Sequence, residues 1–176
     1  MLRRHLYLDL EDTLTTAFVG RFNWSWSVLN VSKISAAIRQ WQPTEVHLFS
    51  FAIRDKQDVA DFSCCVQPNL EAAFGIRFVT VPSVTEHFLP ACCAMKGLSP
   101  SRVEVQDFMD FWNKQESFRL YCRHKYALAG VNSDPVEVML IDDVVLEEEW
   151  NYPSLNLKGS IFNVDGPRLS EKFPQA

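Results

Sequence analysis

The chain has 176 residues, of which 47% are hydrophobic and 22% are charged, and its formal net charge at pH 7 is -5. This length and composition fit a globular domain that buries about two-thirds of its unfolded surface, and they exclude a disordered chain. The acidic balance, with a pI near 5.3, argues against a surface that binds a nucleic-acid backbone.

The five cysteines indicate reduced thiols. Their number is odd, and the adjacent pairs Cys64-Cys65 and Cys92-Cys93 form neither an ordinary disulfide framework nor a C-x-x-C zinc site. The basic start of the chain is interrupted by Asp9, which argues against a signal peptide, and no apolar run is long enough to cross a membrane. We therefore expect a cytoplasmic protein made of one domain over residues 1–176.

The first predicted elements are a strand, a flap, a helix and a second strand. A nearly continuous apolar run predicts a buried strand over residues 6–10. Residues 15–31 lack a helical period but carry several aromatic side chains. They predict a hairpin or irregular flap, which either packs its aromatic side chains on the core or forms a small cap over a ligand. A helix over 32–41 and a strand over 46–49 then complete a right-handed βαβ unit.

The rest of the chain continues this alternation. The expected elements are a helix over 55–65, a further turn over 69–74, a strand over 76–81, helices over 83–97, 103–112 and 117–129, and strands over 136–141 and 161–164. The glutamates at 147–149 are interpreted as a solvated face or loop, and residues 167–176 as a polar tail. This order predicts an α/β fold in which helices cover both faces of a mainly parallel sheet.

Three of the predicted strands end in polar or acidic side chains. The first strand leads into Asp9 and Glu11, the second ends at Ser50, and the strand over 136–141 ends at Asp142 and Asp143. Ligands of open α/β sheets bind outside the carboxyl ends of the strands. We therefore expect these side chains to converge on one crevice.

These residues resemble the motifs of the haloacid dehalogenase (HAD) superfamily. Residues 9–14, Asp-Leu-Glu-Asp-Thr-Leu, look like its first motif, with Glu11 at the position where a second Asp is usual. Ser50 looks like the second motif, and the pair Asp142-Asp143 looks like the fourth. The resemblance covers roughly residues 6–144.

The resemblance implies a HAD-like, Rossmann-like fold with a small cap, and the activity of a phosphatase. Asp9 would attack phosphorus and form an aspartyl-phosphate, and Glu11 would protonate the leaving oxygen and then activate water. Ser50 would donate a hydrogen bond to a phosphoryl oxygen. The third motif is a lone Lys or Arg upstream of the acidic pair, for which Lys125 is the best-placed residue and Lys96 the rival.

The resemblance also implies a Mg²⁺ cofactor. Asp9, the backbone carbonyl of Glu11, Asp142 and Asp143 would form an oxygen-only site, which suits this ion. The partner would be a phosphorylated small molecule, either a nucleotide recognised by the aromatic flap or a sugar phosphate. The competing hypothesis is a binding or scaffold protein of the same fold, in which the replacement of the usual Asp by Glu11 indicates that catalytic activity has been lost. The histidines show no metal-ligand spacing and are interpreted as core or surface imidazoles: His5, His47, His87 and His124.

Overall fold

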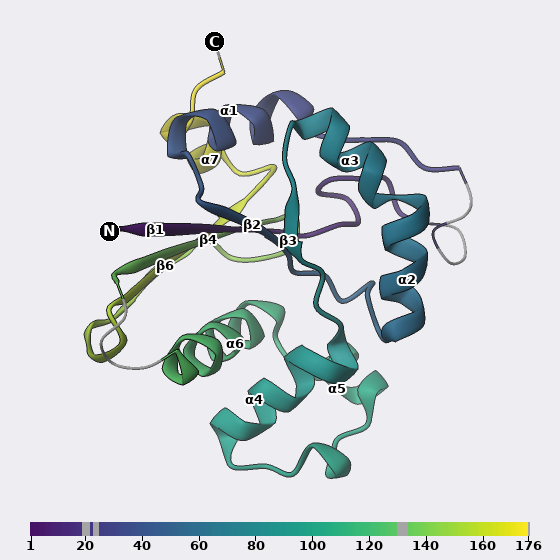
Figure 1. Cartoon of the computed structure of the whole chain (residues 1–176), viewed down its shortest axis with the longest axis vertical. Coiled ribbons are helices and arrows are strands. Elements are labelled where there is room, and N and C mark those ends of the chain that lie inside the picture. The colour runs from purple at the N-terminus through teal and green to yellow at the C-terminus, as the bar shows by residue number, and fades with distance from the viewer. Residues whose placement is uncertain (19–21, 23–24, 130–133, 176) are drawn as a thin grey trace.

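The structure is a computed structural model that describes residues 1–18, 22, 25–129 and 134–175. A six-stranded sheet with the order β3-β2-β1-β4-β6-β5 runs through its centre (Figure 1). All neighbouring strands pair in parallel except β5, which pairs antiparallel with β6 at one edge. The strands are β1 (Arg3–Leu8), β2 (Glu45–Leu48), β3 (Phe78–Thr80), β4 (Val136–Asp142), β5 (Glu148–Tyr152) and β6 (Leu157–Asn163).

Helices cover both faces of this sheet (Figure 1). One layer contains α1 (Val31–Trp41), α2 (Lys56–Cys65), α3 (Gln67–Phe74) and α7 (Pro167–Lys172). The other contains the π-helical turn η1 (Val84–Phe88), α4 (Leu89–Lys96), the 3₁₀ turn η2 (Pro100–Arg102), α5 (Val105–Phe111) and α6 (Lys114–Leu128). A second 3₁₀ turn, η3 (Pro153–Leu155), joins β5 to β6. The α/β class and the mainly parallel sheet predicted from the sequence are confirmed, and the arrangement fits the Rossmann-like class.

Two hydrophobic cores lie on opposite faces of the sheet because successive strand residues point to opposite sides. Leu6 and Leu8 of β1 pack into the core beneath α1, α2 and α3. Tyr7, between them, packs into the core beneath α4 and α6. Burial on both faces explains the continuous apolar run that predicted this strand.

Side-chain caps set the starts of two helices. The Asp55 carboxylate accepts hydrogen bonds from the backbone N–H groups of Gln57 and Asp58 at the start of α2. The Asn113 side chain accepts from the backbone N–H of Glu116 at 3.0 Å, and α6 therefore begins at Lys114, earlier than the expected residue 117. This earlier start places Lys114 in the first turn of α6, at the carboxyl edge of the sheet.

Two elements near the C-terminus differ from the expectation. The glutamates interpreted as a solvated face or loop include Glu148 and Glu149, which pair with β6 in strand β5, so they do not form a loop, although Glu149 is exposed to solvent. The adjacent Trp150 lies directly over Gly159, the one β6 position without a side chain to block it. The predicted polar tail contains α7, and Leu169 in this helix and Phe173 directly after it are buried against the first core. An amphipathic edge strand and a short helix have too few apolar residues to show a clear period.

The aromatic side chains of the flap that the structure describes pack inward. Thr15 and Val28 form an isolated antiparallel bridge. Phe22 is 4% exposed, and its ring lies 4.8 Å from that of Phe18, centroid to centroid. Phe18, Phe22 and Trp26 all pack against the first core, as the first of the two interpretations expected. Trp24, and most of the turn expected at 130–135, lie outside the described residues.

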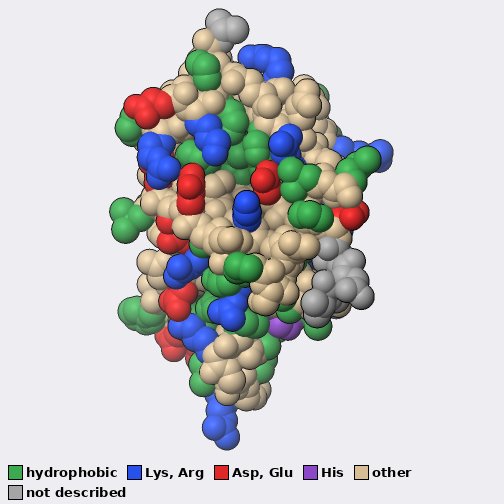
Figure 2. Space-filling view, turned by 90° about the vertical axis from the view of Figure 1, so that its left-hand side faces the viewer, with side chains coloured by type: hydrophobic (Ala, Val, Ile, Leu, Met, Phe, Trp, Pro, Cys, Tyr) green, Lys and Arg blue, Asp and Glu red, His purple; other side chains and the backbone are tan. Residues whose placement is uncertain are grey.

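Figure 2 shows the face on which β1 begins, where basic and acidic side chains are interspersed and neither sign forms a continuous patch. This face therefore has no uniformly positive surface of the kind that binds nucleic-acid phosphates. Among the described residues, no helix is both long enough and apolar enough to cross a membrane.

Candidate active site

The carboxyl ends of β1, β2 and β4 meet at one edge of the sheet (Figure 1). Asp9 directly follows β1, and its backbone N–H still donates to the carbonyl of Ile141 in β4. A cavity of about 460 Å³ lies over this edge, and Asp9, Glu11, Ser50 and Asp143 line it. The structure therefore brings these sequence-predicted site residues together.

Lys114 supplies the cation of the site. Its Nζ lies 2.8 Å from Asp9 Oδ1 and 2.5 Å from Asp142 Oδ2. The three side chains are 18%, 4% and 0% exposed, so this ion-pair triad is largely shielded from water. Burial raises the pKa of Asp9 to about 7, although Lys114 opposes the shift. The two carboxylates raise the pKa of Lys114, which stays charged at neutral pH.

Lys125, the residue chosen from the sequence for this role, lies elsewhere. Its Nζ donates to the Tyr7 hydroxyl at 2.9 Å and lies over aromatic rings beneath α6. The rival, Lys96, pairs with Glu116 at 3.1 Å. The sequence argument failed because it required only a cation upstream of the acidic pair. The overlooked signal for Lys114 is the Asn-x-x-Glu pattern of residues 113–116, which starts the helix just before this lysine.

Residues 10–15 form a tight turn, and Glu11 within it lines the cavity. The backbone N–H groups of Leu14 and Thr15 both donate to the carbonyl of Leu10, at 2.9 and 3.0 Å. Asp12 adopts a left-handed conformation with φ of 60°, a region that Asp tolerates better than most residues. The turn leaves the Glu11 carboxyl partly exposed, and burial, with repulsion from nearby carboxylates, raises its pKa. A raised pKa favours the protonated form that a general acid needs.

Ser50 and several apolar residues complete the cavity wall. Ser50 is 2% exposed, and its Oγ accepts a hydrogen bond from the backbone N–H of Ala52 at 3.3 Å. Its hydroxyl hydrogen therefore remains able to donate to a ligand. The apolar part of the lining consists of Phe51, Ala52, Met109 and Val144. Phe18, Phe22 and Trp26 of the flap do not line this cavity.

The acidic cluster could hold a metal ion. Asp9, Asp142 and Asp143 each offer one carboxylate oxygen, and these atoms lie within 4.8 Å of one another. Burial raises the pKa of Asp143, and the neighbouring Asp142 adds to this effect, as expected where carboxylates crowd together. When all three carboxylates are ionised, Lys114 balances only one of the three negative charges. An oxygen-only donor set with excess negative charge suits a hard divalent cation such as Mg²⁺.

Comparison with protein-family models, with curated proteins and with solved structures found no match. The functional interpretation therefore depends on the geometry and chemistry of the site itself.

A second cluster of potential ligands was missed in the sequence. His5, Glu45 and His47 converge on one point between β1 and β2. Glu45 and His47 are two residues apart and share a face of β2, which the sequence could have indicated. Their meeting with His5 depends on the register between two strands, for which the sequence offers no local signal.

Proposed function

We propose that this protein is a Mg²⁺-dependent phosphatase of the HAD type that acts on a phosphorylated small molecule. One observation carries the proposal, the triad in which Lys114 Nζ joins the carboxylates of Asp9 and Asp142 at the carboxyl edge of the sheet. Phosphoryl transfer needs a positioned nucleophile, charge neutralisation and proton handling. The residues around the cavity offer a candidate for each.

In this proposal Asp9 is the nucleophile, and its carboxylate attacks phosphorus to form an aspartyl-phosphate. Lys114 holds the Asp9 carboxylate at 2.8 Å and neutralises negative charge that develops on the phosphoryl group. Mg²⁺, bound by Asp9, Asp142, Asp143 and the backbone carbonyl of Glu11, would add positive charge that favours ionised Asp9 and stabilises the phosphoryl oxygens. These roles account for a lysine buried between two carboxylates.

Glu11 and Ser50 supply the proton handling and the orientation. Glu11 lines the cavity beside Asp9, and its raised pKa suits a group that first protonates the leaving oxygen and then activates water. Ser50, almost fully buried at the end of β2, donates to a phosphoryl oxygen. The extra methylene of Glu11, relative to the usual Asp, changes the reach of its carboxyl by about 1 Å or more, which can reduce the rate.

The size of the cavity supports a small phosphorylated molecule as the substrate. Its volume of about 460 Å³ is within the range of sites that bind metabolites. Phe51 and Met109 form an apolar wall suited to the ring of a nucleotide or sugar phosphate. The described aromatic side chains of the flap pack into the core, so they give no separate reason to prefer a nucleotide.

The decisive experiment measures inorganic phosphate released from nucleotides, sugar phosphates and an aryl phosphate, with Mg²⁺ or EDTA. We expect metal-dependent turnover that the Asp9→Asn variant loses by at least about 1,000-fold, because the nucleophile is removed. Lys96→Met is the control, since Lys96 forms a similar ion pair outside the cavity. Equal rates in the native protein and Asp9→Asn would contradict the proposal.

A binding or scaffold protein without turnover is the competing function, and Glu11 is the observation that favours it. The Glu11→Asp variant separates the two. Turnover that appears or rises in this variant would show that the site is complete except for the reach of Glu11. Absence of turnover in both proteins, with no Mg²⁺-dependent rise in melting temperature, would favour the scaffold.

A further inference from the structure

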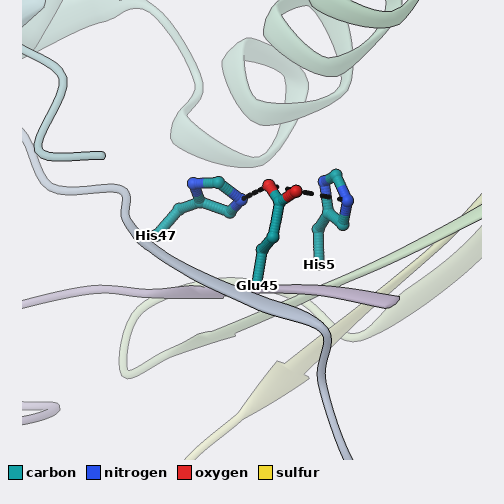
Figure 3. Close-up of side chains that lie close together, drawn as sticks. All are labelled: His5, Glu45 and His47. Carbon is teal, nitrogen blue, oxygen red and sulfur yellow. Dashed lines mark ion pairs between the residues drawn. The ribbon is translucent and has the colours of Figure 1, made fainter. Parts of the chain in front are cut away.

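A second potential metal site lies near the start of β1 and β2, built by residues that the proposed phosphatase chemistry does not use. His5 is the direct cross-strand partner of Glu45, and His47 is the partner of Tyr7. All three side chains rise from the same side of the sheet, with the Glu45 carboxylate between the two imidazoles (Figure 3). His5 and His47 are each 1% exposed, whereas the Glu45 side chain is 30% exposed and leaves a route from solvent.

His5, Glu45 and His47 each offer one donor atom within 4.8 Å of the others, and two of the distances are close to those of a tetrahedral site. Glu45 Oε2 lies 3.7 Å from His5 Nε2 and 3.1 Å from His47 Nε2. Ligands about 2.0–2.1 Å from a tetrahedral Zn²⁺ lie about 3.4 Å from one another, between these two values. Both Nε2 atoms are buried, and although each faces the Glu45 carboxylate, neither makes a hydrogen bond within the described part of the chain. A buried polar atom without a partner is uncommon and suggests a missing ligand.

Each imidazole is also held through its second nitrogen. His5 Nδ1 is hydrogen-bonded to the Tyr126 hydroxyl, and His47 Nδ1 to Thr80 Oγ1 at 2.9 Å. When Nδ1 carries the proton and donates it to these oxygens, each Nε2 presents a lone pair toward Glu45. Histidines that bind metals are usually oriented by such outer hydrogen bonds. Burial also lowers the pKa of both imidazoles, which keeps them neutral at pH 7.

We propose that His5 Nε2, His47 Nε2 and Glu45 Oε2 bind one Zn²⁺ ion, with water as the fourth ligand. Two imidazoles and one carboxylate are a donor set that zinc accepts, whereas Mg²⁺ prefers oxygen ligands alone. The ion would join β1 to β2 on the side of the sheet that faces α6. It would stabilise the folded state by binding in a geometry that the unfolded chain lacks.

Two cations limit the affinity of this site. Arg3 pairs with the other Glu45 oxygen, Oε1, at 3.2 Å, and its side chain is 40% exposed. Lys125 donates to Tyr7, whose hydroxyl lies 2.9 Å from that of Tyr126. Both positive charges repel a dication. Removal of Arg3, the more exposed of the two, should therefore tighten zinc binding.

The first test is a zinc titration of the EDTA-treated full chain against a chromophoric chelator of known affinity. We expect one Zn²⁺ per chain at this site, and a loss of affinity of at least about 100-fold in both His47→Gln and Glu45→Gln, because each removes one of three protein ligands. Asp143→Asn, which alters only the acidic cluster, should retain the affinity. Unchanged binding in His47→Gln and Glu45→Gln, or no binding by the native chain, would overturn the proposal.

Thiols are the main alternative ligands, because Cys64 and Cys65 are exposed. A Cys64→Ser/Cys65→Ser variant should bind zinc as the native chain does. Co²⁺ in place of Zn²⁺ should give the intense visible bands of a four-coordinate ion without a thiolate-to-cobalt band in the near ultraviolet. A thiolate band, or loss of binding in the serine variant, would assign the zinc to cysteines and refute the site.

Two further variants test the geometry without removing a ligand. Thr80→Val deletes the hydroxyl that orients His47 and should weaken zinc binding about 10–100-fold. Arg3→Gln should tighten it, whereas Arg4→Gln, a matched change at an exposed arginine paired with Glu137, should not. Because neither variant removes a metal ligand, both test the proposal even if His47→Gln misfolds. Zinc affinities of Thr80→Val and Arg3→Gln that both equal the affinity of the native chain would contradict the proposed arrangement.

Discussion

Replacement of Lys114 by methionine would leave Asp9 and Asp142 facing each other without their cation. In the native structure the ammonium lies 2.8 Å from the Asp9 carboxylate and 2.5 Å from that of Asp142. The Asp9 side chain is 4% exposed and the Asp142 side chain is 0% exposed. Breaking a buried ion pair by removing one partner costs about 3–5 kcal/mol, because the remaining charge has neither water nor a partner. We expect Lys114→Met to lower the free energy of unfolding at pH 7 by this amount.

Lys96→Met is the matched control for this prediction. It removes the same charge from a pair of similar length, Lys96 Nζ to Glu116 Oε1 at 3.1 Å, but these side chains are 38% and 44% exposed. An exposed pair contributes about 1 kcal/mol or less, so the control should cost far less than Lys114→Met. Urea unfolding in EDTA, followed by circular dichroism, measures both values. Equal losses in the two variants would refute the reasoning.

The pH dependence of the Lys114→Met variant provides a second check. Burial already raises the pKa of Asp9 above its unfolded value, and loss of Lys114 raises it further. A folded-state pKa above the unfolded one means that the folded protein binds more protons, so stability rises as the pH falls. Because Asp9 of the native protein itself titrates near 7, the variant and the native protein differ in bound protons mainly above pH 7. Part of the loss should therefore be recovered between pH 9 and pH 7, and Asp9→Asn should recover part of it at pH 7. A loss that is constant across this range would exclude an electrostatic cause.

Three further outcomes follow from the packing and the buried imidazoles. Burial lowers the pKa of His5 to about 4 and that of His47 to about 2, whereas both titrate near 6.5 when unfolded. As the pH falls from 8 to 5 in EDTA, each histidine should therefore lower the free energy of unfolding by about 2 kcal/mol. In urea unfolding, the His47→Gln variant should show only one of these two losses. Gly159→Ala would place a Cβ 2.0 Å from the Trp150 ring and should cost about 1–3 kcal/mol, measured as a fall in melting temperature that is absent if the ring can move freely. Phe22→Ala should cost about 3–5 kcal/mol in urea unfolding yet leave KM unchanged, and a large rise in KM would show that the flap contacts substrate.

The sequence by itself determined the features that depend on neighbouring residues. The apolar run of β1, the acidic turn that follows it and the acidic pair at the end of β4 were all visible, because strand burial and turn formation depend on a few consecutive residues. The α/β alternation followed from the same local periods. The convergence of Asp9, Ser50 and Asp143 on one cavity also followed, since the carboxyl ends of parallel strands share an edge.

Only the tertiary structure decided which distant side chains meet. Lys114 reaches Asp9 and Asp142 because Asn113 starts α6 at the edge of the sheet, and sequence order alone could not choose it over Lys125. His5 meets Glu45 and His47 through the register of β1 against β2, which packing of both faces of the sheet fixes. Such contacts depend on how whole elements pack, and a local pattern carries no information about that packing.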